Sequence, residues 1–425
     1  MSGTETSSPK SHEGPEESIG LVGVGYVGLP VALAFARRGF HVIGYDTNPA
    51  HVAALQNGDP EVVTATADEL LEALKVGSFE PTTDVSRLDH CGAFIICVPT
   101  PLDPGGTPDL SALQAAARMV AQHVQPGVTV VLESTSYPGT TRDIFLPLLE
   151  QRLGQVGQDF CLGFVPERID PGNATYRLEN TPRIVGGVTA TCTDRILALY
   201  EHVVPQCYPV SSPEAAETAK LLENSFRNIN IAWVNELMRF CDEAGLDVDE
   251  VIRAAATKPF GFMAFWPGPG VGGECIPVDP RYLTWRARRA RSPLHLLERA
   301  LDTNDWQPFY AVQQIQYVLQ QSTRPASEAL VLLIGVAYKP NVADVRNAPA
   351  LVIMERLVRC GIRVVYHDPY VSSVDINGEF RHSVSLSDDL LHEVDLAVMV
   401  TEHANIDREY ITRETPRFLD LTHGD

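Results

Sequence analysis

Hydrophobic residues along the first half of the chain alternate between the spacing of strands and that of helices. Residues 18–22 form a short apolar strand, and residues 26–38 have helical apolar spacing with Gly39 as the C-cap. A second strand at 41–45 follows. Further strands are predicted at 93–98, 128–132 and 161–165, with helical patterns between them. Strands that alternate with helices form parallel sheets covered on both faces, so we expect a Rossmann-like domain over residues 18–209.

The middle of the chain has a helical pattern. Residues 211–245 predict one long helix, and either Ser211 or Ser212 suits its N-cap. Shorter helices are predicted at 248–256 and 293–319. The Gly- and Pro-rich stretch KPFGFMAFWPGPGVGGECIPVDP between them predicts a long functional loop. We therefore expect a central helical domain over residues 210–322.

The last hundred residues repeat the pattern of the first domain. A strand and turn at 328–339, a helix at 349–360 and strands at 362–369 and 394–400 are predicted. Asp368 stands where the first copy has Asp46, but the glycine fingerprint of that copy is missing. We expect a second Rossmann-like domain, residues 323–425, that binds something other than a dinucleotide. The fold class is therefore α/β, with two Rossmann-like parallel-sheet domains joined by a central helical domain with a long connecting helix.

Composition and charge exclude several classes of protein. The chain has 425 residues, 44% of them hydrophobic and 20% charged, which excludes a wholly disordered protein, although residues 1–17 predict a disordered tail. No apolar run approaches the roughly 18 residues of a membrane span. With 33 basic and 54 acidic residues, a net charge of −21, neither nucleic acid nor an anionic membrane is an expected partner. A locally positive pocket for a small anion remains compatible with this charge.

The cysteine pattern and the missing motifs bear on chemistry and location. Eight cysteines without a CxxC pair, and a start without a secretory signal, predict reduced thiols in the cytoplasm. Neither a Walker A motif nor HExxH is present, so we expect neither ATP nor a metal. No tyrosine is followed four residues later by lysine, which argues against a short-chain epimerase or dehydratase.

A dinucleotide site is predicted at the first strand-to-helix turn. Gly23, Gly25 and Gly28 form GxGxxG, which allows a tight turn, close approach of a pyrophosphate and close helix packing. Asp46 ends the second strand, at about the 20-residue spacing expected of a ribose ligand. A carboxylate there accepts from the ribose 2′-hydroxyl and repels a 2′-phosphate, so NAD is favoured over NADP.

A reactive thiol is predicted in the long loop. Cys275 follows several glycines, and the carboxylate of Asp279 stands four residues on, whereas the other seven cysteines suit packing. Lys220 and Asn224 share a face of the long helix, where they could stabilise an oxyanion or simply face solvent. A thiol can add to an aldehyde, and the thiohemiacetal can be oxidised to a thioester that water cleaves. This predicts a four-electron oxidation that uses two NAD.

The motifs together resemble one family. These are GVGYVGLP, ICVPTPLD, ESTSYPGTT, PERIDPGN, AKLLENSFRNINIAWVNE, PGPGVGGECIPVDP and GVAYKPNVADVRNAPA. In this order they are similar to those of the nucleotide-sugar 6-dehydrogenases, which oxidise UDP-glucose and UDP-N-acetylhexosamines. The resemblance covers nearly everything after residue 17. It implies an N-terminal NAD domain, a central dimerising region and a C-terminal UDP-binding domain.

The resemblance also implies roles for individual residues. The residues implied in catalysis are Cys275 as nucleophile, Asp279 to orient water and assist proton removal, Lys220 and Asn224 for the oxyanion, and Glu167 and Thr135 for the hydrolytic water. Those predicted or implied to bind the cofactor are Gly23, Gly25, Tyr26, Val27, Gly28, Asp46, Pro99, Thr100, Ser134, Thr135 and Arg346. Those implied to bind the UDP-sugar are Glu167, Arg168, Lys220, Asn224, Lys258, Phe265, Gly270, Gly272, Gly273, Tyr338 and Lys339.

Three residues depart from common forms of the family. Glu274 precedes the nucleophile where His, Tyr or Ser is frequent, and a carboxylate there disfavours the thiolate. Val165 replaces a frequent Ser or Asn, and His51 stands where an Arg often borders the adenosine. We expect these departures to affect efficiency and cofactor affinity rather than the type of reaction.

The motifs most resemble the branch that oxidises UDP-N-acetylhexosamines, best of all UDP-N-acetylglucosamine, to make a uronic acid for a surface polysaccharide. UDP-glucose, UDP-N-acetylgalactosamine and UDP-N-acetylmannosamine stay open as substrates. A two-electron hydroxyacid dehydrogenase and a non-catalytic nucleotide-binding protein are more distant alternatives. The long apolar helix favours a homodimer, although burial within one chain would also explain it.

Overall fold

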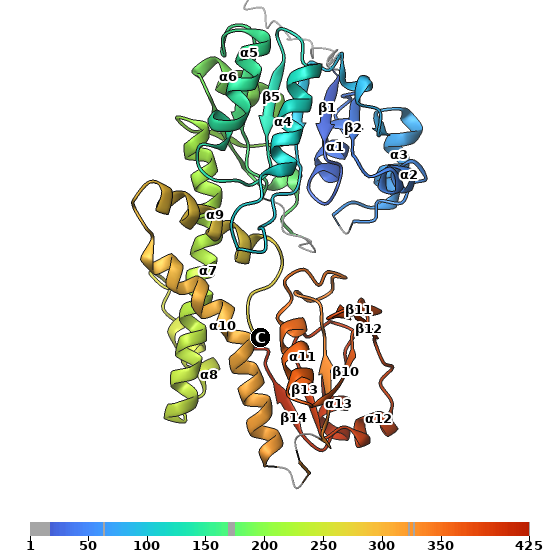
Figure 1. The fold of residues 1–425 in the computed structure, drawn as a ribbon, viewed down its shortest axis with the longest axis vertical. Helices are drawn as coiled ribbons and strands as arrows, with labels where there is room; N and C mark the ends of the chain where they lie inside the picture. Colours follow the sequence, from blue (N-terminus) through green and yellow to red (C-terminus); the bar gives the residue numbers. More distant parts are fainter. Residues whose placement is uncertain (1–17, 63, 169–174, 322–323, 326–327, 425) are drawn as a thin grey trace, which may run out of the picture. The chain divides into compact units, whose positions relative to one another are not determined.

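The computed structural model describes residues 18–62, 64–168, 175–321, 324–325 and 328–424. The chain forms two compact units (Figure 1). The first consists of residues up to Thr100 together with Asp109–Thr218, and the second of Pro101–Pro108 together with Ala219–Asp425. The predicted tail at 1–17 lies outside the described residues. The domain boundaries predicted after residues 209 and 322 stay predictions.

The first unit is built on one large sheet. Its described strands are β1 (Ile19–Val22), β2 (Val42–Tyr45), β3 (Phe79–Thr82), β4 (Ala93–Ile96), β5 (Thr129–Leu132), β6 (Cys161–Phe164), β7 (Arg183–Gly187) and β8 (Cys207–Pro209). The order is β3–β2–β1–β4–β5–β6–β7–β8. Neighbouring strands are parallel except β6 and β7, so the last two strands run against the other six described. The order of the first strands leaves the end of β1 between β2 and β4, a position typical of dinucleotide sites.

Helices cover this sheet. They are α1 (Gly28–Arg37), α2 (Pro49–Gln56), α3 (Ala67–Val76), α4 (Ser111–His123), α5 (Leu146–Leu153) and α6 (Ala190–Tyr200), with short turns η1 (Val85–Leu88), η2 (Thr141–Phe145) and η3 (Leu178–Asn180). Helix α1 is apolar on nearly all sides and is buried from Gly28 to Ala36. Its Phe35 packs edge-on against Tyr200 of α6, with ring centroids 5.6 Å apart. One core cluster therefore joins α1, α6 and the sheet.

The second unit combines helices with a smaller sheet. Its helices are the greater part of α7 (Pro213–Ala244), α8 (Val248–Ala256), α9 (Cys275–Arg289), α10 (His295–Gln320), α11 (Pro349–Arg359), α12 (Asp388–Glu393) and α13 (Arg408–Glu414). The described strands β9 (Leu330–Ile334), β10 (Arg363–His367), β13 (Leu396–Met399) and β14 (Phe418–Asp420) form a parallel sheet in the order β10–β9–β13–β14. Strands β11 (Ser373–Ile376) and β12 (Glu379–His382) form an antiparallel hairpin. The predicted fold class is confirmed.

Several local predictions need correction or completion. Ser212 is the residue that caps α7, because its Oγ accepts from the N–H of Ala215 at 3.3 Å. Strands β3, β7 and β8 were not predicted, since they carry polar or proline residues. The prediction that Cys275 lies in a loop is wrong: the residue begins the 15-residue helix α9. Pro277 and Pro280 suggested a loop. The first turn of a helix tolerates Pro277 because its N–H groups have no intrahelical partner, whereas Pro280 lies inside α9 and removes one hydrogen bond.

Candidate active site

The glycine turn between β1 and α1 has the geometry of a dinucleotide cradle. Gly23 has a φ of 88°, and a Cβ there would lie 2.7 Å from the carbonyl oxygen of Cys97. A Cβ on Gly28 would lie 1.8 Å from the carbonyl oxygen of Gly23, so the helix starts directly against the turn. A Cβ on Gly25 would meet no described atom within 4 Å. Gly25 therefore borders the open space that a pyrophosphate requires.

Asp46 is placed to serve this cradle. Its Oδ2 accepts from the N–H of Val24 at 3.2 Å, and Oδ1 accepts from the N–H of Asn48 at 2.9 Å. The carboxylate is half-buried at the end of β2. Each oxygen keeps capacity for a further donor, as a ribose diol requires. The residues present thus fit NAD.

His51 lies beside this site, and both of its ring nitrogens are near acceptors. Its Nδ1 lies 2.6 Å from Oε2 of Glu61, and its Nε2 lies 3.1 Å from the carbonyl oxygen of Val24. Burial lowers the pKa of His51, but the hydrogen bonds to Glu61 and Val24 and the charge of Asp46 raise it overall. Both ring nitrogens face acceptors, so the imidazolium is the form that satisfies both contacts.

The ESTSYPGTT segment is held in place mainly by hydrogen bonds to other residues of the first unit. Ser134 donates its hydroxyl to the carbonyl oxygen of Val98 at 2.8 Å, which fixes the segment against the strand end that leads to Pro99 and Thr100. Glu217 of α7, which the sequence did not single out, accepts from the N–H of Gly139 at 2.6 Å and from the N–H of Thr141 at 2.9 Å. Burial raises the pKa of Glu217 to about 7. Much of this motif is therefore structural.

A buried charged cluster, also missed from the sequence, lies under the PER segment. Glu133, Arg183 and Tyr200 are each at most 2% exposed. Arg183 Nη1 donates to the carbonyl oxygen of Pro166 at 2.8 Å and lies 3.9 Å from Glu133 Oε2, while the Tyr200 hydroxyl donates to Glu133. Burial raises the pKa of Glu133, although Arg183 and Tyr200 oppose this shift. A lone arginine among apolar strand residues was the sequence signal, because such a charge needs a buried partner.

The predicted residues of the PER segment are placed next to this cluster. Glu167 is buried, at 7% exposure, and Thr135 is half-buried. Arg168 donates from Nη1 to the carbonyl oxygen of Pro182 at 3.0 Å. Residues 169–173 of the motif lie outside the described residues. The roles of Glu167, Arg168 and Thr135 in catalysis or binding stay predictions.

In the second unit, the structure brings Asn224 and Asp279 together. Asn224 Nδ2 donates to Asp279 Oδ2 at 2.5 Å, across 55 residues of sequence. Both side chains are 6% exposed, and Lys220, one turn away on α7, is 7% exposed. This face of α7 is therefore buried, which excludes the alternative of a solvated helix face. A buried amide and a buried cation are suited to stabilising an oxyanion.

Cys275 is exposed and stands at the N-terminus of α9. A helix N-terminus favours a thiolate. The neighbouring Glu274 forms an ion pair with Arg346, with Oε2 and Nη1 2.5 Å apart, and Asp344 holds the other end of the same guanidinium at 2.6 Å. Arg346 thus offsets the charge that Glu274 places beside the thiol. This pairing was not predicted, and a cofactor contact of Arg346 stays a prediction.

The glycines before Cys275 are explained by packing. A Cβ on Gly272 would lie 2.6 Å from the Cβ of Tyr338, and a Cβ on Gly273 would lie 2.8 Å from its ring. The N–H of Gly273 donates to the carbonyl oxygen of Arg346 at 2.8 Å. These contacts fix the segment before the thiol against the loop that carries Tyr338 and Lys339. Gly270, at φ 143°, packs against two prolines.

The remaining predicted substrate residues lie in the same unit. Lys258 is exposed and stacks over the ring of Phe260 at 5.0 Å. Phe265 packs edge-on against Phe226 of α7, with centroids 5.8 Å apart. Phe265 thus has a packing role, and a contact with the sugar stays a prediction for both residues.

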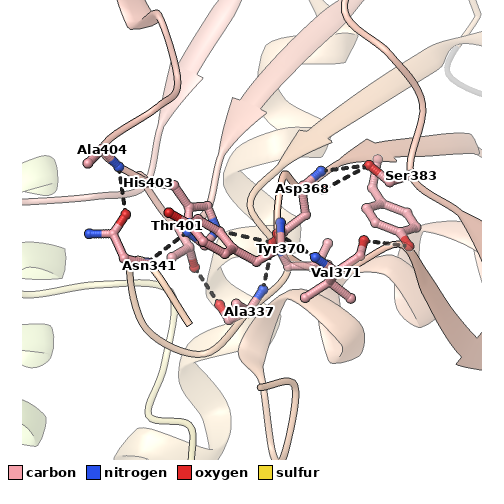
Figure 2. A network of polar contacts seen from close by, with 11 residues as sticks. Ala337, Asn341, Asp368, Tyr370, Val371, Ser383, Thr401, His403 and Ala404 are labelled. Carbon is pink, nitrogen blue, oxygen red and sulfur yellow. Dashed lines mark hydrogen bonds and ion pairs between the residues drawn. The ribbon is translucent and has the colours of Figure 1, made fainter. Parts of the chain in front are cut away.

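Asp368, the counterpart of Asp46, has no capacity left for a ribose (Figure 2). Its Oδ2 accepts from three donors and its Oδ1 from two. The donors are the N–H groups of Val336 and Ala337 and Nε2 of His403, and the N–H groups of Tyr370 and Val371. His403 Nδ1 accepts in turn from the N–H of Asn341 at 2.9 Å. Asp368 therefore organises the loop after β9 instead of a ribose site.

The described residues also bear on metal binding and on membrane insertion. They contain no group of three or more His, Cys, Asp or Glu side chains arranged to hold a metal ion. No helix in the described part of the chain is long and apolar enough to cross a membrane.

Comparison with known proteins agrees with this arrangement. Residues 17–204, 214–306 and 332–422 match the NAD binding, central and UDP binding domains of the UDP-glucose/GDP-mannose dehydrogenase family. The chain is 36% identical to the UDP-N-acetyl-D-glucosamine 6-dehydrogenase of Pseudomonas aeruginosa, covering 85% of each chain. It is 33% identical to the UDP-N-acetyl-D-mannosamine dehydrogenase of Escherichia coli strain K12, covering 93% of this chain and 97% of the relative.

A solved structure described as UDP-D-ManNAc dehydrogenase from Pyrococcus horikoshii has a TM-score of 0.85 to this chain, at 33% identity and with 95% of each chain covered. The glycine cradle, the buried Lys220–Asn224 face and the thiol of α9 thus occur in a chain whose every domain matches one family. The chain belongs to the UDP-glucose/GDP-mannose dehydrogenase family and is an NAD-dependent UDP-sugar dehydrogenase.

Proposed function

We propose that the protein oxidises the C6 hydroxymethyl group of a UDP-N-acetylhexosamine, with UDP-N-acetylglucosamine as the best candidate, to the uronic acid. The observation that carries this proposal is the exposed Cys275 at the start of α9, next to a buried Asn224–Asp279 pair. A simple two-electron alcohol oxidation gives a thiol in this place no role. Gly23, Gly25, Gly28 and Asp46 would hold NAD, and two NAD molecules bound one after the other would each accept one hydride.

In the proposed reaction, the residues of the second unit have different roles. Lys220 and Asn224 stabilise the oxygen as the alcohol passes its proton to water, with the help of Asp279, and the first hydride leaves C6 for the nicotinamide. The Cys275 thiolate then adds to the aldehyde carbon, and the oxygen takes up a proton to give a thiohemiacetal. Loss of that proton and of a second hydride gives a thioester. Water cleaves the carbon–sulfur bond, and the products are the carboxylic acid and the free thiol, with Asp279 orienting the water.

Residues of the first unit complete the proposal. Glu167 activates the hydrolytic water, Thr135 binds it, and Ser134, Pro99 and Thr100 line the cofactor. On the substrate side, Lys339 and Tyr338 contact the UDP-sugar. The burial of Glu167 above the Arg183 cluster supports a fixed carboxylate, and the packing of Tyr338 against the glycines before Cys275 supports a shared substrate site in the second unit.

The substrate is tested with a panel of UDP-sugars and NAD. The panel contains UDP-glucose, UDP-N-acetylglucosamine, UDP-N-acetylgalactosamine and UDP-N-acetylmannosamine, and NADH absorbance is followed to completion. We expect two NADH per UDP-N-acetylglucosamine consumed and an acid as product. The two curated relatives differ in their sugar, one named for the glucosamine and one for the mannosamine substrate, so the epimers are the comparison that decides. One NADH per sugar, with a free aldehyde, contradicts the proposal.

The role of the thiol is tested with Cys275→Ser, and Cys360→Ser is the matched control because Cys360 is also exposed. We expect Cys275→Ser to lose acid formation and Cys360→Ser to keep it. A two-electron dehydrogenase would retain full turnover in both variants. Binding of NAD and UDP by calorimetry without reduction of NAD by any sugar would instead favour a non-catalytic nucleotide-binding protein.

We also propose a homodimer. Leu222, Phe226, Trp233 and Phe240 are 45% to 62% exposed on α7, and their spacings of four and seven residues place them on one face of that helix. A second copy of the chain is the proposed cover for this stripe. Trp233→Asp should give monomers in sedimentation velocity, whereas Phe380→Asp, on the exposed β12, should not. If the unmodified chain sediments as a monomer, the proposal is wrong.

A further inference from the structure

The first turns of α9 contain a gap in the helical hydrogen bonds. In an α-helix each carbonyl oxygen accepts from the N–H four residues later. The partner of Ile276 would be residue 280, which is a proline and has no N–H. The Ile276 carbonyl oxygen therefore needs a donor from outside its own helix, directly after the cysteine.

Asn228 of α7 supplies this donor. Its Nδ2 lies 3.1 Å from the carbonyl oxygen of Ile276. The side chain is fully buried, and its Oδ1 has no hydrogen-bond partner among the described residues. The backbone around Asn228 is also fixed, because its carbonyl oxygen accepts from Asn304 Nδ2 of α10 at 3.0 Å. The amide group of Asn228 thus contacts α9 through its NH₂ group, from a rigid position between helices.

Two amide side chains on one face of α7 therefore anchor the start of α9. Asn224 contacts the Asp279 carboxylate, and Asn228, one turn further, contacts the Ile276 carbonyl. The second anchor differs from the first because it acts on the backbone and not on a predicted catalytic side chain. The thiol of Cys275 is attached one residue before the anchored carbonyl. Any rotation of this turn moves the sulfur.

We propose that Asn228 is a positioning residue, which replaces the hydrogen bond removed by Pro280 and so fixes Cys275 relative to Asp279. This inference rests on the proposed role of Cys275 as nucleophile. Without the anchor, the first turn of α9 keeps its place in the chain but loses its fixed orientation. A displacement of about 1 Å at a reacting atom costs on the order of 100-fold in rate.

The first measurement compares Asn228→Ala with the unmodified full chain. We expect kcat to fall roughly 10- to 100-fold, with KM values for NAD and the UDP-sugar changed by less than about threefold, because positioning of the nucleophile affects chemistry more than binding. Asn230→Ala is the matched control, since Asn230 lies on the same helix and donates to Phe226 of its own helix at 2.7 Å. It should leave kcat unchanged.

The decisive measurement is rescue by Pro280→Ala. Alanine at 280 restores an N–H that can donate to Ile276 within α9, so Asn228 becomes dispensable. Asn228→Ala in the Pro280→Ala background should lower kcat by less than about threefold relative to Pro280→Ala alone, a coupling that a double-mutant cycle isolates. A general structural defect at position 228 would not be rescued by one N–H.

A readout without turnover completes the test. The rate at which iodoacetamide alkylates Cys275, followed as a function of pH by mass spectrometry of the peptide that contains this residue, should change in Asn228→Ala and return to the parent profile in the double variant. Asn228→Leu removes the donor at similar volume and introduces no charge, so it should behave as Asn228→Ala does, which keeps the test open if the alanine variant fails to fold.

The outcomes separate the two proposals. If Cys275→Ser keeps full conversion to acid, the proposed function is wrong, whatever Asn228 does. If Cys275→Ser abolishes conversion while Asn228→Ala and Asn228→Leu keep full kcat, or if the Pro280→Ala background gives no rescue, the positioning role of Asn228 is wrong and the proposed function stands.

Discussion

Replacement of Asp368 by asparagine tests the polar network that organises the second sheet. Burial by itself would raise the pKa of Asp368, but hydrogen bonds from His403 and from backbone N–H groups lower it to about 2, from a usual 3.8. A shift of this size corresponds to about 2 kcal/mol of stability. Asparagine also turns an NH₂ group toward buried N–H donors, which costs about 1–3 kcal/mol more. We expect Asp368→Asn to lower the free energy of unfolding by about 3–5 kcal/mol at pH 7.

The pH dependence has a definite sign. Because the folded pKa lies below the unfolded value, the charge contribution is complete above pH 3.8 and is lost as the pH falls toward 2. The difference in unfolding free energy between Asp368→Asn and the parent chain should therefore become smaller at acid pH. Hydrogen exchange of the amides in residues 335–341 measures the local opening free energy in the full chain, where a two-unit protein need not unfold in one step.

Asp375→Asn is the matched control. Its carboxylate is exposed and accepts from the N–H of Gly378 at 2.7 Å in the β11–β12 turn of the same unit. This variant should lower the free energy of unfolding by less than about 1 kcal/mol, as expected when one exposed hydrogen bond is lost. If Asp368→Asn loses no more than the control at pH 7, or if its deficit stays constant from pH 6 to pH 3, the reasoning about this network is refuted.

Three further predictions concern the sites themselves. Gly28→Ala should abolish NAD binding in calorimetry or prevent folding, because the new Cβ would lie 1.8 Å from the carbonyl oxygen of Gly23; retained NAD affinity would contradict the tight turn. Glu217→Gln should weaken the pH dependence of the unfolding free energy between pH 4.5 and 7 by about one proton, because the raised pKa makes the folded state less stable as the pH rises through that window. Denaturant titrations at both ends of the window measure this, and an unchanged slope of unfolding free energy against pH would contradict it. Asn224→Asp should lower kcat roughly 100-fold above neutral pH, because its carboxylate would face that of Asp279 in a buried site; kcat measured against pH, with an undiminished alkaline value, would exclude this.

The cofactor end of the protein could be predicted from the sequence because its geometry is local. Gly23, Gly25 and Gly28 act within one turn, and Asp46 ends the next strand. Each requirement concerns neighbouring residues and a short crossover. Lys220 and Asn224 were likewise found by helical spacing, although burial of their face required the packed structure.

The sequence by itself determined the glycine cradle, the parallel sheets and the residue types of the thiol site. The tertiary structure decided which of these residues meet. Asn224 contacts Asp279 across 55 residues of sequence, and Asp368, which occupies the place of Asp46, is saturated by donors from its own loop, from the loop after β9 and from His403. Cys275 is the first residue of a helix although glycines and prolines surround it, and Asn228 of α7 donates to the carbonyl oxygen that Pro280 leaves without its helical donor. Local preference is set by neighbours in the chain, whereas the satisfaction of buried polar groups depends on which elements pack together.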